Sequence, residues 1–146
     1  MNEIQNPNSD DCRNKIQNNF QYINYKSQGK KRVYDLRERL LLFSKRIIDI
    51  GRLLPRMPEC DGIRRQLINA GTSVGANYEE ADGALTKKDF INKVCISRKE
   101  AKEVRYWLRV VSNTYLQEKE IAADIIEAEE IICILSAIIR NSQAKE

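Results

Sequence analysis

The sequence predicts an all-α protein, an antiparallel four-helix bundle with up-down-up-down topology. Apolar residues recur in alternating steps of three and four residues along four separate segments, which is the spacing of one helix face. The 146 residues include only 6 Gly and 3 Pro, which favours a few long elements over many short strands. With 42% apolar and 32% charged residues, the chain is long enough to form one globular domain around a real core.

Residues 1–32 are predicted to form a mostly disordered polar tail, and residues 33–146 to form the bundle domain. The tail is rich in Asn, Gln and Lys, and it sustains no hydrophobic period. Its aromatic residues Phe20, Tyr22 and Tyr25 lie close in sequence to a basic run that ends at Arg32. The tail could therefore clasp a single-stranded nucleic acid, although we favour a flexible terminus.

We expect a cytoplasmic protein without a membrane segment. The first residues contain no apolar stretch of the kind that forms a signal peptide. The longest apolar run, Ile131–Leu135, is far too short to span a bilayer. The four cysteines are far apart, with none in a C-x-x-C pair, and we expect them to remain reduced. They are Cys12, Cys60, Cys95 and Cys133.

The first two helices are predicted over residues 33–54 and 60–81. The stripe of the first consists of Leu36, Leu40, Phe43, Ile47, Ile50 and Leu54, widened by Leu41, Leu42 and Ile48. Pro55 and Pro58 are expected to end this helix and to lie in the loop that follows. The stripe of the second consists of Ile63, Leu67, Ala70, Val74, Asn77 or Tyr78, and Ala81.

The third and fourth helices are predicted over residues 87–115 and 118–139. Asp82 and Gly83 signal a stop before the third, and Thr86 with Asp89 forms a capping box at its start. Its stripe consists of Phe90, Val94, Ser97, Ala101, Val104, Leu108, Val111 and Tyr115. The stripe of the fourth consists of Ile121, Ile125, Ala128, Ile132, Leu135 and Ile139.

The predicted fourth helix carries apolar residues well beyond one stripe. The additional residues are Ile126, Ile131, Ile134 and Ile138. A helix with two apolar faces often has a second partner, which favours self-association of the chain. The alternative is that the helix simply lies deep in its own bundle.

The stretch Gly71–Ala84 is predicted to be the second-helix half of a close-packed hairpin. A turn centred near residue 85 places Val74 opposite Ser97 and Ala70 opposite Ala101. Two glycines within a helix cost about 1 kcal/mol each relative to alanine, and close approach to the third helix would offset that cost. Asn77 and Glu80 fall near the core stripe, with Glu103 nearby on the third helix. They could form a buried polar pair that sets register or subunit pairing.

No enzymatic chemistry is expected, and no cofactor, metal ion or small-molecule substrate. The chain has no histidine, so it contains neither a Ser–His nor a Cys–His dyad, and a zinc site is not expected. Glycine-rich nucleotide-binding motifs and the nucleophile-elbow motif are absent from the sequence. A sharper alternative uses carboxylates as metal or acid–base ligands, but di-metal bundles combine Glu with His. Those carboxylates are Glu79, Glu80, Glu100 and Glu103.

Charge is unevenly distributed along the chain. Residues 13–109 contain 22 Lys or Arg and 11 Asp or Glu, a net charge of +11, whereas residues 118–130 contain six acids and one Lys. Such regions can attract polyanions, pair between subunits or simply be solvated. On the predicted third helix, a cationic edge off the core stripe could lie along phosphates without reading bases. It consists of Lys88, Lys99, Lys102 and Arg109.

Several short motifs give this sequence a family resemblance. Ser73–Ala81 (SVGANYEEA), followed by Lys87–Ile91 (KKDFI), Lys99–Glu103 (KEAKE) and Tyr106–Leu108 (YWL), resembles a family of bacterial four-helix-bundle proteins. These proteins are named after open reading frames in 23S rRNA intervening sequences. The resemblance covers roughly residues 33–139, and the family motif positions fall on Asn77, Glu80, Phe90 and Glu103.

The resemblance implies a ring-forming homo-oligomer, typically a pentamer. A related branch, the accessory variability proteins of diversity-generating retroelements, forms a barrel with a basic surface and binds a reverse transcriptase and its RNA. Most members have no established activity. The family often has Gly where Ala81 stands, and a long polar tail before residue 33 is not typical of it.

These observations lead to one leading hypothesis and one alternative. We expect a non-enzymatic, homo-oligomeric helical bundle that presents a basic surface to RNA or to a nucleic-acid enzyme such as a reverse transcriptase. The alternative is a protein-interaction or assembly module that has no nucleic-acid role.

Overall fold

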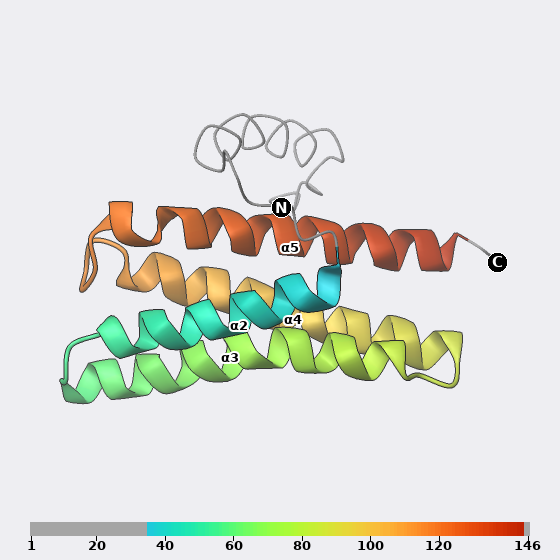
Figure 1. Cartoon of the computed structure of the whole chain (residues 1–146), viewed down its shortest axis with the longest axis horizontal. Coiled ribbons are helices and arrows are strands. Elements are labelled where there is room, and N and C mark those ends of the chain that lie inside the picture. Colours follow the sequence, from blue (N-terminus) through green and yellow to red (C-terminus); the bar gives the residue numbers. More distant parts are fainter. Residues whose placement is uncertain (1–34, 145–146) are drawn as a thin grey trace, which may run out of the picture. The chain divides into compact units, whose positions relative to one another are not determined.

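The computed structural model describes residues 35–144, and within them the chain forms four α-helices and no strand. The all-α prediction is therefore confirmed for this part of the chain. The helices are α2 (Leu36–Leu53), α3 (Pro58–Asp82), α4 (Lys87–Val111) and α5 (Glu118–Gln143), shown in Figure 1. The predicted tail over residues 1–32 lies outside the described residues.

Local backbone chemistry moves several helix ends from their predicted positions. Asp35 starts α2 three residues later than predicted, because its carboxylate accepts a hydrogen bond from the Arg37 N–H at 3.0 Å. Pro58 does not lie in the loop; it occupies the first turn of α3, where its missing N–H has no helical partner. Helix α4 ends at Val111 because Asn113 turns the chain with a φ of 57°.

Consecutive helices pack against one another around one apolar core. The predicted stripes supply most of this core, so the periodicity identified the buried faces correctly. On α2, for example, the four stripe residues from Leu40 to Ile50 are all buried, and Leu36 is partly buried. Thr86 caps α4 as predicted, accepting a hydrogen bond from the Asp89 N–H at 3.1 Å.

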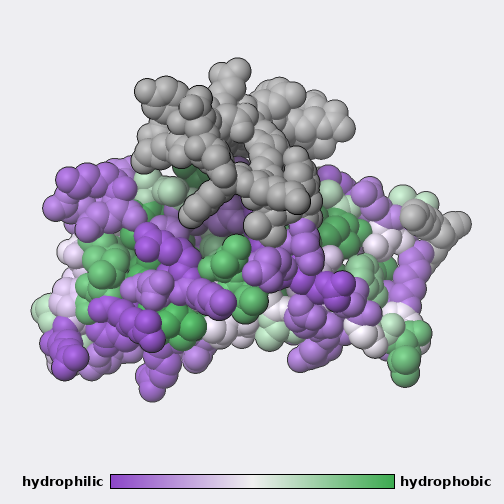
Figure 2. All heavy atoms as spheres, in the orientation of Figure 1, coloured by the Kyte–Doolittle hydropathy of each residue, from purple (hydrophilic) through white to green (hydrophobic). Residues whose placement is uncertain are grey.

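The extra apolar residues of α5 are covered more completely than the sequence suggested. Ile131 is fully buried, and Ile126, Ile134 and Ile138 are partly buried. The exposed large apolar residues of the described part lie on other elements. They are Leu41, Leu42, Leu53, Met57, Leu85 and Tyr106. On the face shown in Figure 2, hydrophobic patches are separated by hydrophilic side chains.

The contact between α3 and α4 follows the predicted register. The Ser97 hydroxyl, which is fully buried, donates a hydrogen bond of 2.7 Å to the Val74 carbonyl oxygen. Ala70 and Ala101 are also buried. The pairing of Val74 with Ser97 is therefore confirmed, and a small hydroxyl residue satisfies a helix carbonyl inside the core.

Gly71 and Gly75 of α3 face α2, so their predicted role against α4 is wrong. A Cβ at Gly71 would lie 2.5 Å from Ile47 Cγ2, and a Cβ at Gly51 of α2 would lie 2.8 Å from Ile68 Cδ1. Ile47 of α2 therefore packs against Gly71 of α3, and Ile68 of α3 packs against Gly51 of α2. Ser44 supports this contact by donating a hydrogen bond of 2.9 Å to the Gly71 carbonyl oxygen.

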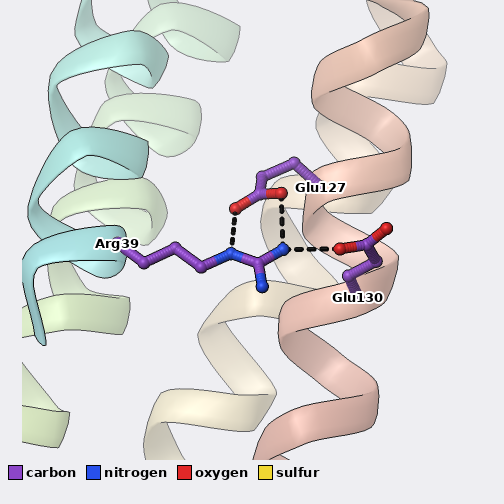
Figure 3. Close-up of polar contacts among 3 residues, drawn as sticks. All are labelled: Arg39, Glu127 and Glu130. Carbon is purple, nitrogen blue, oxygen red and sulfur yellow. Dashed lines mark hydrogen bonds and ion pairs between the residues drawn. The ribbon is translucent and has the colours of Figure 1, made fainter. Parts of the chain in front are cut away.

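Arginines of α2 neutralise acidic residues of α5. Arg39 makes a two-pronged contact with Glu127, at 2.7 Å for each hydrogen bond, and a further bond of 2.6 Å to Glu130 (Figure 3). These hydrogen bonds raise the pKa of Arg39 further above its ordinary value, despite its partial burial. Arg46 binds Asp124 at 2.9 and 3.1 Å. Much of the acidic charge on residues 118–130 is thus paired within one chain.

Candidate nucleic-acid interface

The four predicted phosphate-binding residues form a cationic row on the outward face of α4. Lys88, Lys99, Lys102 and Arg109 are all exposed. Because an α-helix turns about 100° per residue, their spacing places them within an arc of about 80°, opposite the buried face of α4. No hydrogen bond or ion pair joins any of the four to another residue of the described range 35–144. Within this range, the α4 row therefore consists of exposed cations without an ion-pair partner.

Other basic side chains of α4 have partners on neighbouring helices. Lys93 forms an ion pair with Glu80 of α3. Arg105 lies 3.5 Å from a carboxylate oxygen of Glu129 on α5. Lys93 and Arg105 are thus paired with acidic residues of α3 and α5, whereas the α4 row lies on the outer face of the helix.

Tyr106 also belongs to this outer face, and our sequence interpretation did not include it. It is 59% exposed. It follows Lys102 by four residues and precedes Arg109 by three, so the helical period that groups the cations groups this ring with them. The spacing of three and four residues from Lys99 leads through Lys102 to Tyr106 and Arg109. Tyr106 can therefore be found from the sequence when residues other than cations are considered.

Trp107 contacts the Tyr106 ring, and Glu103 forms a hydrogen bond with Trp107. The rings of Tyr106 and Trp107 meet edge to face, with centroids 5.0 Å apart and planes at 73°. Trp107 packs against the core, and its indole N–H donates a hydrogen bond of 3.3 Å to the Glu103 carboxylate. Glu103 therefore orients an aromatic pair, and Phe90, another predicted motif residue, packs partly buried against the core.

The predicted buried pair of Asn77 and Glu80 is not formed. The Asn77 amide donates a hydrogen bond of 2.9 Å to the Ser73 carbonyl oxygen, one turn back on its own helix. The Glu80 side chain is 59% exposed and is paired with Lys93. The two side chains have different environments: Asn77 is half-buried and satisfies its amide on its own helix, whereas Glu80 lies on the exposed side of α3.

The candidate carboxylates are not assembled into a metal site. No group of three or more Cys, Asp or Glu side chains among residues 35–144 is placed to hold a metal ion. The pKa of Glu100 is raised by partial burial and, to a lesser extent, by the nearby charge of Glu103.

A groove of about 540 Å³ lies between α2 and α3. Small residues from both helices line it, including Ser44, Gly75 and Ala76, together with the apolar side chains of Leu41 and Ile48. Leu41 is 47% exposed.

In the described part of the chain, no helix combines the length and apolarity needed to cross a membrane.

Comparison with known proteins places this chain in a family. The sequence profile described as 23S rRNA-intervening sequence protein matches residues 33–137, well over half of the chain. The chain belongs to this family. The family resemblance expected from the sequence motifs is thus confirmed, and the matched region includes α2, α3, α4 and most of α5.

A solved structure agrees with this membership. The chain is similar to a protein of unknown function from the S23 ribosomal protein family of Bacteroides thetaiotaomicron VPI-5482, known from a crystal structure at 1.70 Å resolution. The two share 33% sequence identity with a TM-score of 0.68, over 73% of this chain and 99% of the relative. A comparison with curated proteins finds no match.

Proposed function

We propose that this member of the 23S rRNA-intervening sequence protein family is a non-enzymatic, homo-oligomeric bundle that binds RNA, or an enzyme acting on nucleic acid such as a reverse transcriptase. In this proposal the bundle has antiparallel, up-down-up-down topology. It assembles into a ring of five subunits, as the family resemblance implies, and works in the cytoplasm. The α4 row of Lys88, Lys99, Lys102 and Arg109 is its binding surface.

The observation that carries the proposal is that the four exposed cations of the α4 row have no ion pair with any residue in the range 35–144. On α5, acidic side chains are engaged by Arg39, Arg46 and Arg105. The positive charge of the α4 row is not neutralised in this way by any residue of the described part. A row of exposed cations attracts a polyanion, and each phosphate it neutralises releases condensed counterions.

The first prediction tests this surface by charge reversal. We expect the triple variant Lys99→Glu, Lys102→Glu and Arg109→Glu to lose at least tenfold in affinity for a mixed-sequence RNA near 50 mM salt. The slope of log affinity against log salt should fall by about 2, because three phosphate contacts are removed. Filter binding at several salt concentrations measures both quantities.

A matched control removes the same charge elsewhere. Arg56, Arg65 and Lys119 are exposed and lie off the α4 row. Changing all three to Glu alters the net charge equally, and we expect a smaller loss of affinity and a nearly unchanged salt slope. If both triple variants lost the same affinity for RNA, the loss would follow from net charge alone. That result would contradict the proposal that the α4 row is the binding surface.

Self-association has a different candidate surface, the groove between α2 and α3. Leu41 and Leu42 on α2 are 47% and 46% exposed, and Leu41 also lines the groove. Adjacent exposed leucines beside an apolar groove are unfavourable in water and are typical of an interface. We propose that a second copy of the chain covers them.

The second prediction concerns the mass of the assembly. We expect the intact chain to sediment as a multiple of 17.0 kDa, and Leu41→Lys with Leu42→Lys to shift it toward the monomer. Leu85 is 98% exposed in the turn before α4, so Leu85→Lys is the control and should leave the mass unchanged. A monomeric wild-type chain at micromolar concentration would exclude the ring.

The alternative function is an assembly or protein-interaction module without a nucleic-acid role. The groove and the exposed leucines of α2 support it independently of the α4 row. It predicts an oligomer whose mass depends on Leu41 and Leu42, with no salt-sensitive RNA binding by the wild-type chain. The two experiments together therefore distinguish the functions.

A further inference from the structure

We propose that Tyr106 is a stacking platform for an unpaired base of a single-stranded nucleic acid, set within the α4 row. The inference rests on the proposed nucleic-acid function and defines its substrate class as a single strand with unpaired bases, as opposed to a duplex. The residues involved are Lys99, Lys102, Tyr106 and Arg109, with Glu103 and Trp107 in support.

The exposure of Tyr106 is the first observation. Among the large apolar residues that are exposed in the described range, Tyr106 is the one aromatic residue. At 59% exposure it presents much of its ring to solvent. Proteins that bind single strands use such rings because every base has a π-face that can stack on them.

The second observation is that the ring is held in place. Trp107 meets Tyr106 edge to face at 5.0 Å, and Trp107 is fixed by core packing and by its hydrogen bond to Glu103. A ring that is already oriented loses less conformational freedom when a ligand binds than a freely rotating one. The same hydrogen bond engages Glu103, the acid one turn before Tyr106, on the indole of Trp107.

The third observation is the placement of charge along the helix. Lys102 lies about one turn before Tyr106 and Arg109 about one turn after it, while Lys99 extends the series by another turn. A base stacked on the ring would thus have cations on both sides for the phosphates that precede and follow it. The segment from Lys99 to Arg109 spans about 15 Å of helix.

This combination favours a single strand over the other polyanions. In a duplex the bases are paired and stacked inside, so only the phosphates would meet α4 and the ring would contribute nothing. An acidic peptide would satisfy the cations but offers no planar face. The alternation of cations with one oriented aromatic ring is typical of surfaces that bind single strands.

The experiment compares a single strand with a duplex. The full-length chain is titrated with oligouridine and with a duplex of oligouridine and oligoadenosine of the same length. We expect tighter binding of the single strand, and a loss of roughly tenfold in that affinity for Tyr106→Ala. Duplex affinity and the salt slope should stay unchanged, because the variant removes no charge.

Two further variants separate stacking from size and hydrogen bonding. Tyr106→Phe retains the ring and should keep the affinity for the single strand, whereas Tyr106→Leu retains apolar bulk and should lose it. Trp107 is the sole tryptophan of the chain, so its fluorescence reports on the platform. It should change on binding oligouridine but not on binding the duplex.

Each outcome has a clear meaning. If single strand and duplex bind equally, and Tyr106→Ala has no effect while the α4 charge reversal still abolishes binding, the platform is wrong and the proposed function stands. If the wild-type chain binds neither nucleic acid, both proposals fail. Displacement of oligouridine by polyglutamate as effectively as by unlabelled oligouridine would assign the surface to an acidic protein and overturn the platform.

Discussion

Replacing Gly71 by alanine is expected to destabilise the protein, although alanine is the better helix former. A Cβ at this position would lie 2.5 Å from Cγ2 and 2.8 Å from Cβ of Ile47. Ile47 is fully buried, so it cannot move aside without displacing its own neighbours. Overpacking of this kind costs about 3 kcal/mol, and the gain in helix propensity returns about 1 kcal/mol.

The expected net effect is a fall of about 2 kcal/mol in the free energy of unfolding. Urea denaturation followed by circular dichroism measures it. The chain supplies its own control, because a Cβ at Gly62 of α3 meets no atom within 4 Å. Gly62→Ala should therefore raise the free energy of unfolding by up to about 1 kcal/mol.

A double-mutant cycle identifies the cause. Ile47→Ala removes Cγ2 and Cγ1, two of the three atoms nearest to the new Cβ, and leaves the Cβ of residue 47, at the cost of a cavity. The loss caused by Gly71→Ala should then be smaller in the Ile47→Ala background than in the wild type, which gives a favourable coupling energy between the two sites. Additive losses, or a stabilising Gly71→Ala, would contradict close packing at this contact.

The sequence predicted the core faces well because burial follows helical periodicity. Val74 and Ser97 illustrate this success: both lie on an apolar stripe, and a turn near residue 85 leaves one register that pairs them. Antiparallel pairing of two stripes needs only the period and the turn position. Both can be read from the amino acids without knowing the other helices.

The sequence did not predict which neighbour receives a given small residue. Gly71 lies one position from Ala70 but faces α2, because a rotation of about 100° per residue turns it toward the other neighbour. Asn77 failed for a related reason. Its position beside the stripe suggested a polar partner in the core, but the half-buried amide bonds to the Ser73 carbonyl oxygen of its own helix, a choice of partner that the stripe does not determine.

Contacts between helices far apart in the sequence were also beyond prediction. Arg39 and Glu127 are 88 residues apart, and charge alone gives each of them many candidate partners. The cations of the candidate site could be predicted from the sequence, because they share one face of one helix. Tyr106 was not predicted, because its proposed role depends on its exposure and on its edge contact with Trp107.

Removing the charge of Arg39 is expected to weaken the contact between α2 and α5. Arg39 joins Glu127 and Glu130 through three hydrogen bonds, and the three side chains are only 27%, 30% and 12% exposed. Arg39→Met would leave two carboxylates close together, partly buried and without their cation. We expect a loss of about 2–4 kcal/mol in the free energy of unfolding, less than for a fully buried pair.

Arg39 also sets how this contact responds to pH. Because the folded-state pKa of Arg39 is raised above its ordinary value, its contribution to stability is fully present below that ordinary value and is lost only as pH rises through the folded value. The guanidinium therefore stays charged throughout the neutral and acidic range. Denaturation of wild type and Arg39→Met at neutral pH isolates the removal of a cation from any change in its protonation.

The triple variant Arg39→Met, Glu127→Gln and Glu130→Gln decides how the loss arises. If most of the lost stability comes from uncompensated carboxylates, neutralising Glu127 and Glu130 should recover more than half of the stability lost by Arg39→Met alone. Arg52→Met is the control, because Arg52 pairs with Asp49 while 75% exposed and should cost little. A triple variant no more stable than Arg39→Met would show instead that the packing of the arginine stem between α2 and α5 provides the stability.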